Sequence, residues 1–477
     1  MNNHKLDFMM SALHHGTQIT TGEVLAWMKQ KNDEVAYELK QVPLSTLKGW
    51  NDRDDRIAHD TGKFFSIQGL RIQTNYGIVP VWDQPIINQP EIGFLGFIVQ
   101  KKEGVLHFLM QAKIEPGNLN VVQLSPTLQA TKSNYTRVHQ GRAPRYLEYF
   151  TGEKRVDVLV DQLQSEQGAR FYQKRNRNII VEVPEGEELP MYDNFIWVTL
   201  GQIKELLNYP NVINMDSRTV ISCIQYGDYT EKDLLLLSAF RHLSDKSRAD
   251  SFFYSILSSE NHYKSLNEIL HWITTLKCEY EITVDKIGLS EMKHWVYDGN
   301  TVEHEQKKYF SVIGVDVSIG NREVTTWSQP MVKSAQEGLM GFLVKKINGI
   351  YHFLVQAKLE PGNFDILEMA PTVQCLTGNY RKGQNEYTIP YLEYFVNAPK
   401  ENIWYSAFQS EEGGRFFKEQ NLNMIIEVGD DFPLEVERNY CWMTLNQLQN
   451  FVTYNNYLNI GARSLLSAIQ FYDAQAI

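Results

Sequence analysis

The chain has 477 residues, of which 43% are hydrophobic, 12% aromatic and 22% charged, the composition of a folded globular protein rather than a disordered one. This length is enough for roughly two to four domains with large cores. The net charge of −11 argues against a general nucleic-acid binder, which needs a basic face to replace phosphate counterions.

Motifs that would indicate other classes of protein are missing. The four cysteines include no Cys-x-x-Cys pair, which predicts reduced thiols rather than a zinc site or a disulfide framework. No signal peptide is predicted, and no apolar run of about 18 residues predicts a transmembrane helix. The chain also lacks a Gly-x-Gly-x-x-Gly turn, a P-loop and a His-Glu-x-x-His motif. We therefore expect a cytoplasmic protein with no cofactor and no metal, whose partners include neither membrane nor nucleic acid.

The first quarter of the chain predicts a helix, a strand and a hairpin in that order. Residues 20–30 (TTGEVLAWMKQ) combine a threonine cap with helical spacing of apolar residues. Residues 63–74 (KFFSIQGLRIQT) are rich in aromatic and β-branched residues, which is typical of a strand. Residues 95–118 predict a hairpin with its turn at Glu103-Gly104.

Helices and a strand are predicted in the next hundred residues. Residues 157–176 (DVLVDQLQSEQGARFYQKRN) are predicted to be helical, or a loop followed by a helix, and lead into a strand at 179–183. Another helix is predicted to begin at Thr199. Strands and helices alternate, but several strand pairs are joined by short turns. We therefore expect an α+β fold with a mixed, largely antiparallel sheet and flanking helices.

The same features return 245 residues later. The phrase QAKIEPGN at 111–118 returns as QAKLEPGN, and YLEYF at 146–150 returns unchanged. SEQGARF at 165–171 returns as SEEGGRF. A constant offset over about 200 positions leaves almost no room for insertions, so the chain is an internal duplication.

Each repeat is long enough to be a whole domain rather than one unit of a solenoid. We expect an N-terminal domain at 1–228 and a C-terminal domain at 264–477. The residues between them, 229–263, have helical spacing and contain neither proline nor glycine, so they predict a helical connector.

The repeated phrase QAKIEPGN gathers polar side chains at the end of a strand. Because side chains alternate between the faces of a strand, Gln111 and Lys113 share one face, and the opposite face is apolar. The polar strip continues into a turn that carries Glu115 and Asn118. Such groups can bind hydroxyls or a phosphate. The alternative is a salt bridge between Lys113 and Glu115, with Asn118 in an Asx turn.

A long loop after this strand differs between the two copies. In the first copy it carries basic, hydroxyl and imidazole groups, namely Tyr135, Arg137, His139, Arg142 and Arg145. In an acidic protein such a cluster suits a small anion such as a pyrophosphate, and a solvated loop is the alternative. In the second copy His139 is replaced by Gln384, and Arg142 and Arg145 are also replaced. The shared positions favour binding in both repeats, and the unshared ones favour chemistry in the first repeat only.

Arg170 and Arg415 occupy equivalent positions in the repeated phrase Ser-Glu-x-Gly-x-Arg-Phe. Each arginine either contacts a phosphate or pairs with a neighbouring carboxylate, and the sequence leaves both interpretations open.

Several long segments, among them GFIVQKKEGVLHFLMQAKIEPGN, VQLSPTLQATKSNYTRVHQG and YLEYF, together with the duplication, resemble the NDP-hexose 2,3-dehydratases of deoxysugar biosynthesis. The resemblance spans nearly the whole chain. It implies a homodimer whose subunit contains two duplicated domains of Nudix-hydrolase-like fold. Both copies lack the Arg-Glu-x-x-Glu-Glu core of a catalytic Nudix box, which fits a fold kept after metal-dependent hydrolysis was lost.

The resemblance also implies a substrate and a reaction. The substrate is dTDP-4-keto-6-deoxy-D-glucose, and no redox cofactor is needed. The ketone at carbon 4 acidifies the proton on carbon 3, so a general base removes that proton and hydrogen-bond donors stabilise the enolate. The hydroxyl on carbon 2 then leaves as water with the help of a general acid. The product is a 3,4-diketo-2,6-dideoxy sugar.

Residue roles follow from combining the polar positions with this reaction. The candidate catalytic residues are Lys113, Glu115, Tyr135 and His139. The candidate binding residues of the first repeat are Trp50, Gln111, Asn118, Gln129, Asn134, Arg137, Arg142, Arg145 and Arg170, with Phe65 as a further aromatic that could stack on thymine. Those of the second repeat, which would form a second nucleotide-sugar site, active or vestigial, are Gln356, Lys358, Asn363, Gln374, Tyr380 and Arg415.

Two other functions compete with this hypothesis. A nucleotide diphosphate hydrolase is disfavoured by the missing metal box. A non-catalytic tandem nucleotide-sugar binding protein is disfavoured by the asymmetry of the two loops, because a pure binder gains little from losing His and Arg in one copy.

Overall fold

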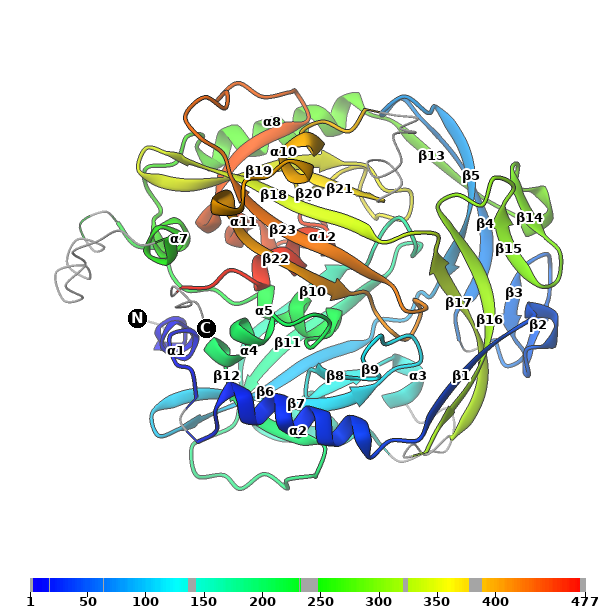
Figure 1. The fold of residues 1–477 in the computed structure, drawn as a ribbon, viewed down its shortest axis with the longest axis horizontal. Helices are drawn as coiled ribbons and strands as arrows, with labels where there is room; N and C mark the ends of the chain where they lie inside the picture. The colour runs from blue at the N-terminus through cyan, green and yellow to red at the C-terminus, as the bar shows by residue number, and fades with distance from the viewer. Residues whose placement is uncertain are drawn as a thin grey trace.

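The computed structural model shows two similar halves that meet across a shared core (Figure 1). It describes residues 3–16, 18–62, 64–135, 143–230, 232, 248–320, 325–376 and 388–471. Strands and helices alternate in both halves, which confirms the predicted α+β class. Within the described ranges, no helix is long and apolar enough to cross a membrane.

A seven-stranded mixed sheet forms the centre of each half. The first sheet comprises β6 (Phe94–Lys102), β7 (Val105–Ile114), β8 (Val122–Ser125), β9 (Leu128–Ala130), β10 (Asp157–Ser165), β11 (Arg175–Glu182) and β12 (Phe195–Thr199). The second comprises β18 (Gly338–Ile347), β19 (Ile350–Lys358), β20 (Glu368–Ala370), β21 (Val373–Leu376), β22 (Ile403–Ser410), β23 (Gln420–Glu427) and β24 (Tyr440–Thr444). β6 pairs with β11 in parallel, as β18 does with β23, and the hairpin partners are antiparallel.

Two five-stranded antiparallel sheets lie at one side of the molecule, at the right of Figure 1, and each contains a strand from the other repeat. One holds β1 (Tyr37–Val42), β14 (Trp295–Tyr297), β15 (Thr301–His304), β16 (Phe310–Ile319) and β17 (Thr326–Ser334). The other holds β2 (Trp50–Asp52), β3 (Ile57–His59), β4 (Ser66–Thr74), β5 (Val81–Asn88) and β13 (Ile282–Ile287). β1 of the first repeat pairs with β16 of the second, and β13 of the second pairs with β4 of the first. The repeats have therefore exchanged strands.

The predicted hairpin is confirmed and one predicted helix is wrong. Glu103 and Gly104 both have positive φ between β6 and β7, as the tight turn requires. Residues 157–165, expected to be helical or a loop before a helix, form strand β10 instead. Its residues pair antiparallel with β11 from Asp157↔Glu182 to Ser165↔Arg175. Backbone pairing with a neighbouring strand overrode the weak local helical pattern.

The described helices are mostly short and well capped. They are α1 (Asn3–Ala12), α2 (Thr21–Asp33), α3 (Lys132–Tyr135), α4 (Leu200–Leu206), α5 (Met215–Ser222), α7 (Arg248–Leu257), α8 (Leu266–Glu279), α10 (Leu392–Val396), α11 (Leu445–Val452) and α12 (Ile460–Ser467), and four single turns are η1 (Leu44–Thr46), η2 (Leu147–Tyr149), η3 (Leu289–Glu291) and η4 (Lys400–Asn402). The helices predicted at Thr20 and Thr199 are confirmed, and both begin with a capping box. α7 lies in the predicted connector, of which residues 231 and 233–247 fall outside the described ranges.

The largest core lies between the two seven-stranded sheets and includes residues of both repeats. Phe97 and Phe108 of the first sheet and their counterparts Phe342 and Phe353 of the second are fully buried in it. Helices α5 and α12 pack against each other in this region (Figure 1). The two repeats therefore share one hydrophobic core instead of folding as separate units.

Candidate active site

The turn at the end of β7 contacts the other repeat, and so does the equivalent turn after β19. Gly117 N donates to Gly413 O at 2.7 Å, and Lys418 N donates to Gly117 O at 2.9 Å. In the second repeat, Gly362 N donates to Gly168 O at 2.7 Å. Each QAK-x-EPGN turn thus lies against the Ser-Glu-x-Gly-x-Arg-Phe segment of the other repeat. Two clusters of buried polar residues result, and these clusters are called here the first pocket (around Glu115) and the second pocket (around Glu360).

A chain of hydrogen bonds orders the first pocket. Lys113 Nζ donates to Gln129 O at 3.1 Å, and Gln129 Nε2 donates to Glu115 Oε1 at 2.8 Å. Asn214, the cap of α5, donates from Nδ2 to Gln129 Oε1 at 3.0 Å. The predicted residues Lys113, Glu115 and Gln129 therefore lie together. Asn214 was missed by the sequence reasoning, although it is duplicated as Asn459 at the same offset.

The second pocket repeats this chain. Lys358 Nζ donates to Gln374 O at 3.0 Å, Gln374 Nε2 donates to Glu360 Oε1 at 3.3 Å, and Asn459 Nδ2 donates to Gln374 Oε1 at 2.9 Å. Burial lowers the pKa of Lys358. The predicted second-repeat residues Lys358 and Gln374 are thus brought together in the same way as their first-repeat counterparts.

Several buried polar atoms of the pockets lack a hydrogen-bond partner among the described residues. Among them are Glu115 Oε2 and Asn118 Oδ1 in the first pocket, and both amide atoms of Asn363 in the second. Glu115 is 6% exposed and Asn118 is 2% exposed. An unpaired buried polar atom is costly, so such atoms point to a ligand that supplies the missing bonds. Asn118 Nδ2 donates to Val121 O at 3.0 Å. This bond within the turn is also compatible with the alternative that Asn118 has a structural role in the turn.

Arg170 and Arg415 cross between the repeats. The Arg415 guanidinium lies 4.1 Å from the centroid of the Phe65 ring, and that of Arg170 lies 4.0 Å from the centroid of Phe310. Burial lowers the pKa of both arginines, and carboxylates oppose this: those near Arg415 include Glu412 and Glu115, and those near Arg170 are Glu419, Glu360 and Glu411. Arg415 of the second repeat therefore belongs to the first pocket, and Arg170 to the second. The nearby carboxylates fit the carboxylate interpretation, and Arg170 Nε, which is buried without a partner among the described residues, fits the phosphate interpretation.

Two carboxyl groups of the first pocket are replaced by other residues at the equivalent positions of the second pocket. Asp216 lies in the first turn of α5, 3% exposed, where the second repeat has Gly461. Glu412 belongs to the Ser-Glu-Glu-Gly segment, where the first repeat has Gln167. Burial and the neighbouring carboxylates, Glu115 among them, raise the pKa of Asp216 well above its ordinary value and that of Glu412 to about 8. Sequence reasoning missed both residues, although comparison at the offset of 245 would have exposed them.

Gln111 and Arg145 lie at the outer edge of the first repeat. Gln111 pairs with Phe195 on the neighbouring strand β12, and Arg145 Nη1 donates to Asn194 Oδ1 at 2.8 Å. The Arg145 guanidinium also lies 3.8 Å from the centroid of the Tyr192 ring. At the equivalent edge of the second repeat, Gln356 lines an open cavity of about 180 Å³ together with Tyr280, Pro390, Glu437, Arg438, Asn439 and Tyr440. The predicted binding residues Gln111, Arg145 and Gln356 thus share one type of location.

Other predicted residues lie in the core or outside the described ranges. Trp50 is 6% exposed, and its indole Nε1 donates to Ser328 O at 2.8 Å, while Phe65 is 4% exposed. These contacts support packing roles for the two rings. Tyr135 is half-buried against Phe94, and burial raises its pKa. Arg137, His139, Arg142 and Tyr380 lie outside the described residues, as does the side chain of Asn134.

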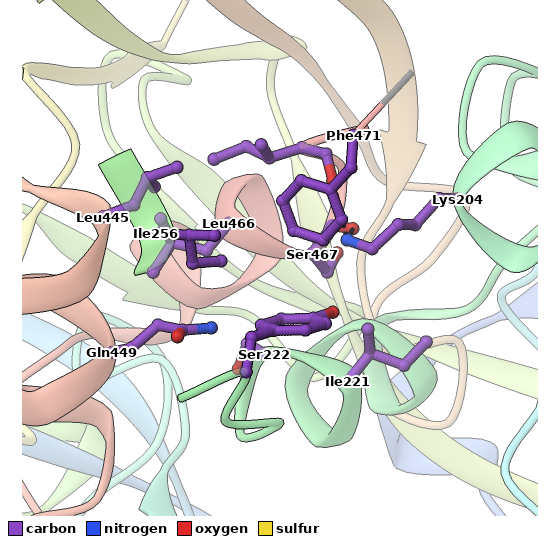
Figure 2. Close-up of a pocket in the computed structure, with 11 residues that line it drawn as sticks. Lys204, Ile221, Ser222, Ile256, Leu445, Gln449, Leu466, Ser467 and Phe471 are labelled. Atoms are coloured by element: carbon purple, nitrogen blue, oxygen red, sulfur yellow. Dashed lines mark hydrogen bonds between the residues drawn. The ribbon is translucent and has the colours of Figure 1, made fainter. Parts of the chain in front are cut away.

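A second, smaller cavity lies in the shared core and is drawn in Figure 2. Its volume of about 20 Å³ is close to that of one water-sized probe, so it is too small for a sugar nucleotide. Lys204 points into it, and its Nζ donates to Ser467 O at 3.1 Å and to Ile469 O at 2.7 Å (Figure 2). This cavity is a structural feature of the junction between the repeats.

Comparison with known proteins identifies the family. A family model described as NDP-hexose 2,3-dehydratase matches residues 21–224 and again residues 266–469. The chain belongs to the NDP-hexose 2,3-dehydratase family. The resemblance seen in the sequence is confirmed, and the two matches agree with the internal duplication.

Three relatives match the chain over nearly its full length. All three carry the name dTDP-4-dehydro-6-deoxy-alpha-D-glucopyranose 2,3-dehydratase. The protein of Saccharopolyspora spinosa is 43% identical over 94% of this chain and 91% of its own. That of Amycolatopsis orientalis is 38% identical over 98% and 94%, and that of Streptomyces violaceoruber is 40% identical over 93% and 96%. This chain is thus similar to dehydratases throughout, not in one domain alone.

Proposed function

We propose that this chain is a nucleotide-sugar 2,3-dehydratase whose substrate is dTDP-4-keto-6-deoxy-D-glucose, the sugar nucleotide in the names of its relatives. The observation that carries the proposal is the first pocket. There, in a chain of the dehydratase family, Lys113, Gln129 and Glu115 form an ordered strip with an unpartnered buried carboxylate oxygen. The product is dTDP-3,4-diketo-2,6-dideoxy-D-glucose.

The chemistry needs the groups that this pocket provides. A base removes the proton on carbon 3, which the ketone at carbon 4 acidifies, and a cation or hydrogen-bond donor stabilises the enolate oxygen. A carboxylate such as Glu115 suits the first role and the ammonium of Lys113 the second. The hydroxyl on carbon 2 then leaves with a proton from a general acid, and the enol tautomerises to the diketone. Tyr135 and His139 stay candidates for acid or base.

The remaining assignments are part of the same proposal. Each repeat has a Nudix-hydrolase-like fold, and the protein works as a cytoplasmic homodimer. The repeat at 1–228 carries the chemistry, and the repeat at 264–477 carries a second nucleotide-sugar site. The basic side chains Arg137, Arg142 and Arg145 contact the pyrophosphate. Gln111 and Asn118 contact the sugar. The extra carboxyl groups of the first pocket support chemistry at that pocket.

One experiment separates this function from its alternatives. The protein is incubated with dTDP-4-keto-6-deoxyglucose in deuterated buffer without added cofactor, and the sugar is followed by NMR and mass spectrometry. We expect loss of one water from the substrate. Release of a nucleoside monophosphate would point to a hydrolase. Unchanged substrate that raises the melting temperature would point to a non-catalytic binding protein.

A further inference from the structure

Glu412 reaches from the second repeat into the first pocket. The backbone bond between Gly117 and Gly413 brings the Ser-Glu-Glu-Gly segment against the turn that carries Glu115. Glu115 Oε1 lies 3.6 Å from the point that a Cβ on Gly414 would occupy, and Glu412 Oε1 lies closer still to the same point. Both carboxyl groups therefore lie close to the same point beside Gly414.

Each of the two carboxyl groups has one engaged and one unengaged oxygen. Glu115 Oε1 accepts the Gln129 amide at 2.8 Å, and Glu412 Oε1 accepts Gly414 N at 3.2 Å. Their Oε2 atoms are buried and accept no hydrogen bond from the residues that the structure describes. Burial and the neighbouring Glu115 raise the pKa of Glu412 to about 8, so Glu412 is the member of the pair that holds a proton at neutral pH.

The second pocket has a different residue at the position of Glu412. Gln167 stands where Glu412 would be, and its amide donates to Glu411. Glu360, the counterpart of Glu115, has both oxygens engaged: Oε1 by Gln374 at 3.3 Å and Oε2 by Gly168 N at 3.1 Å. At these equivalent positions, the unpartnered glutamate oxygen and the second carboxyl beside it are therefore present in the first pocket and absent from the second.

Positive groups also lie around the pair. Arg415 and Lys113 both act on Glu412, and both favour its ionised form. Burial and Glu115 outweigh them, so the pKa of Glu412 stays raised to about 8 and this carboxyl keeps its proton at neutral pH. A carboxylate and a carboxylic acid side by side are the base and the acid that a water elimination needs.

We infer that Glu412 is the general acid of the first pocket, paired with Glu115 as the base, so that the active site is assembled from both repeats. This inference rests on the proposed dehydratase function and adds a catalytic residue from the second repeat. The first repeat alone is therefore an incomplete active site.

The pair accounts for every proton in the reaction. The Glu115 carboxylate takes the proton from carbon 3, and the electron pair of that bond forms the enolate on carbons 3 and 4. The enolate pair then forms the double bond between carbons 2 and 3 as the bond from carbon 2 to oxygen breaks. The departing hydroxyl takes the Glu412 proton and leaves as water. In the tautomerisation Glu115 returns its proton to carbon 2, and Glu412 takes the proton of the hydroxyl on carbon 3.

The test separates proton abstraction from loss of water. Glu412→Gln, the residue that the first repeat itself carries at this position, is incubated with dTDP-4-keto-6-deoxyglucose in deuterated buffer. We expect water loss to slow by about 100-fold or more, since general acid–base groups contribute about 10²–10⁴-fold. Exchange of the proton on carbon 3 should continue, because Glu115 is intact. Glu412→Asp keeps a carboxyl and should recover part of the rate. Glu435→Gln, the same change on an exposed side chain, should leave the rate unchanged.

The outcomes distinguish the inference from the function on which it rests. If the unaltered protein removes no water from this substrate, the dehydratase function itself is wrong. If it does so and Glu412→Gln matches its rate, Glu412 is not the acid. Loss of both exchange and elimination in a variant whose melting temperature still rises with substrate would also overturn the assignment, as would a Glu412→Asp variant that recovers nothing.

Discussion

Asp216 and Gly461 differ by one side chain at equivalent positions in the two pockets. At Gly461 a Cβ would lie 3.3 Å from Gln374 Oε1 and 3.5 Å from Asn459 Oδ1. The equivalent Asp216 in the first repeat therefore lies beside Gln129 and Asn214. Its carboxyl thus adds to the first pocket a third acidic group that the second pocket lacks.

The buried carboxyl of Asp216 should make the protein less stable as the pH rises. Because the pKa of Asp216 is raised in the folded protein, the folded state binds more protons than the unfolded state above about pH 4, and the free energy of unfolding falls from there toward the raised pKa. Asp216→Asn removes this fall. In urea unfolding we expect the stability of the variant relative to the parent to increase between pH 4.5 and pH 7.5, and we expect the variant to lose turnover.

An exposed position provides the control for this measurement. Asp430→Asn removes a carboxyl from the surface and should change neither stability nor turnover. A stability difference between Asp216→Asn and the parent that is the same at pH 4.5 and pH 7.5 would contradict the assignment of a raised pKa.

Lys204, at the small cavity of Figure 2, should make the free energy of unfolding rise with pH, opposite to the effect of Asp216. Burial lowers the pKa of Lys204 to about 7. Between this value and about 10.5 the unfolded chain binds the extra proton, so the free energy of unfolding rises with pH. At the equivalent position the second repeat has Gln449, whose Nε2 donates to Ile224 O at 2.9 Å in the manner of Lys204. Lys204→Gln should therefore fold and lose the pH-dependent gain. Unfolding curves of parent and variant at pH 7 and pH 9 check this, and parallel behaviour would refute it.

The backbone of the turn after β7 packs very closely against the other repeat. A Cβ on Gly117 would overlap Phe416 O and lie 2.8 Å from the end of Met331. The glycine of this phrase, repeated as Gly362, is thus required by contact across the repeats. Conservation of the turn residues between the two copies of the chain has a packing cause as well as a chemical one.

Gly117→Ala should therefore destabilise the protein strongly. Overpacking against backbone costs about 1–3 kcal/mol or more, and here the shift would also move Glu115. We expect a lower melting temperature together with weaker protection by substrate. Gly22→Ala, in the first turn of α2 where the nearest atom to an added Cβ is at 3.9 Å, is the matched control and should be neutral. Equal effects of the two changes would show that the close approach at Gly117 is unimportant.

At the scale of the whole molecule, the two repeats form one folding unit. β1 and β13 complete sheets of the opposite repeat. Two buried arginines connect the repeats as well: Arg218 Nη2 donates to Ser410 O at 2.5 Å, and Arg463 Nη2 donates to Ser165 O at 2.5 Å. A single repeat would leave its five-stranded sheet one strand short, and each arginine would lose its acceptor in the other repeat.

Separated repeats should thus fail to fold alone. We expect fragments 1–240 and 241–477 to be insoluble or molten when produced singly, because each exposes an unpaired strand edge and half of the shared core. Produced together, they should assemble and recover substrate binding. Gel filtration and near-ultraviolet circular dichroism check both statements. A fragment with a cooperative unfolding transition of its own would contradict the single folding unit.

The sequence by itself determined the duplication, the family, the capped helices, the hairpin and the polar positions of Lys113 and Glu115 at its end. Each of these depends on local spacing or on direct comparison of the two copies. Only the tertiary structure decided that β1 and β13 each pair with a strand of the other repeat, and that Glu412 and Arg415 belong to the first pocket. Pairing between distant strands leaves no periodic signal in either segment, and a side chain that crosses between repeats is assigned to the wrong site when each repeat is considered alone. For the same reason residues 157–165 were expected to be helical: their strand is stabilised by β11, a partner that local spacing does not reveal.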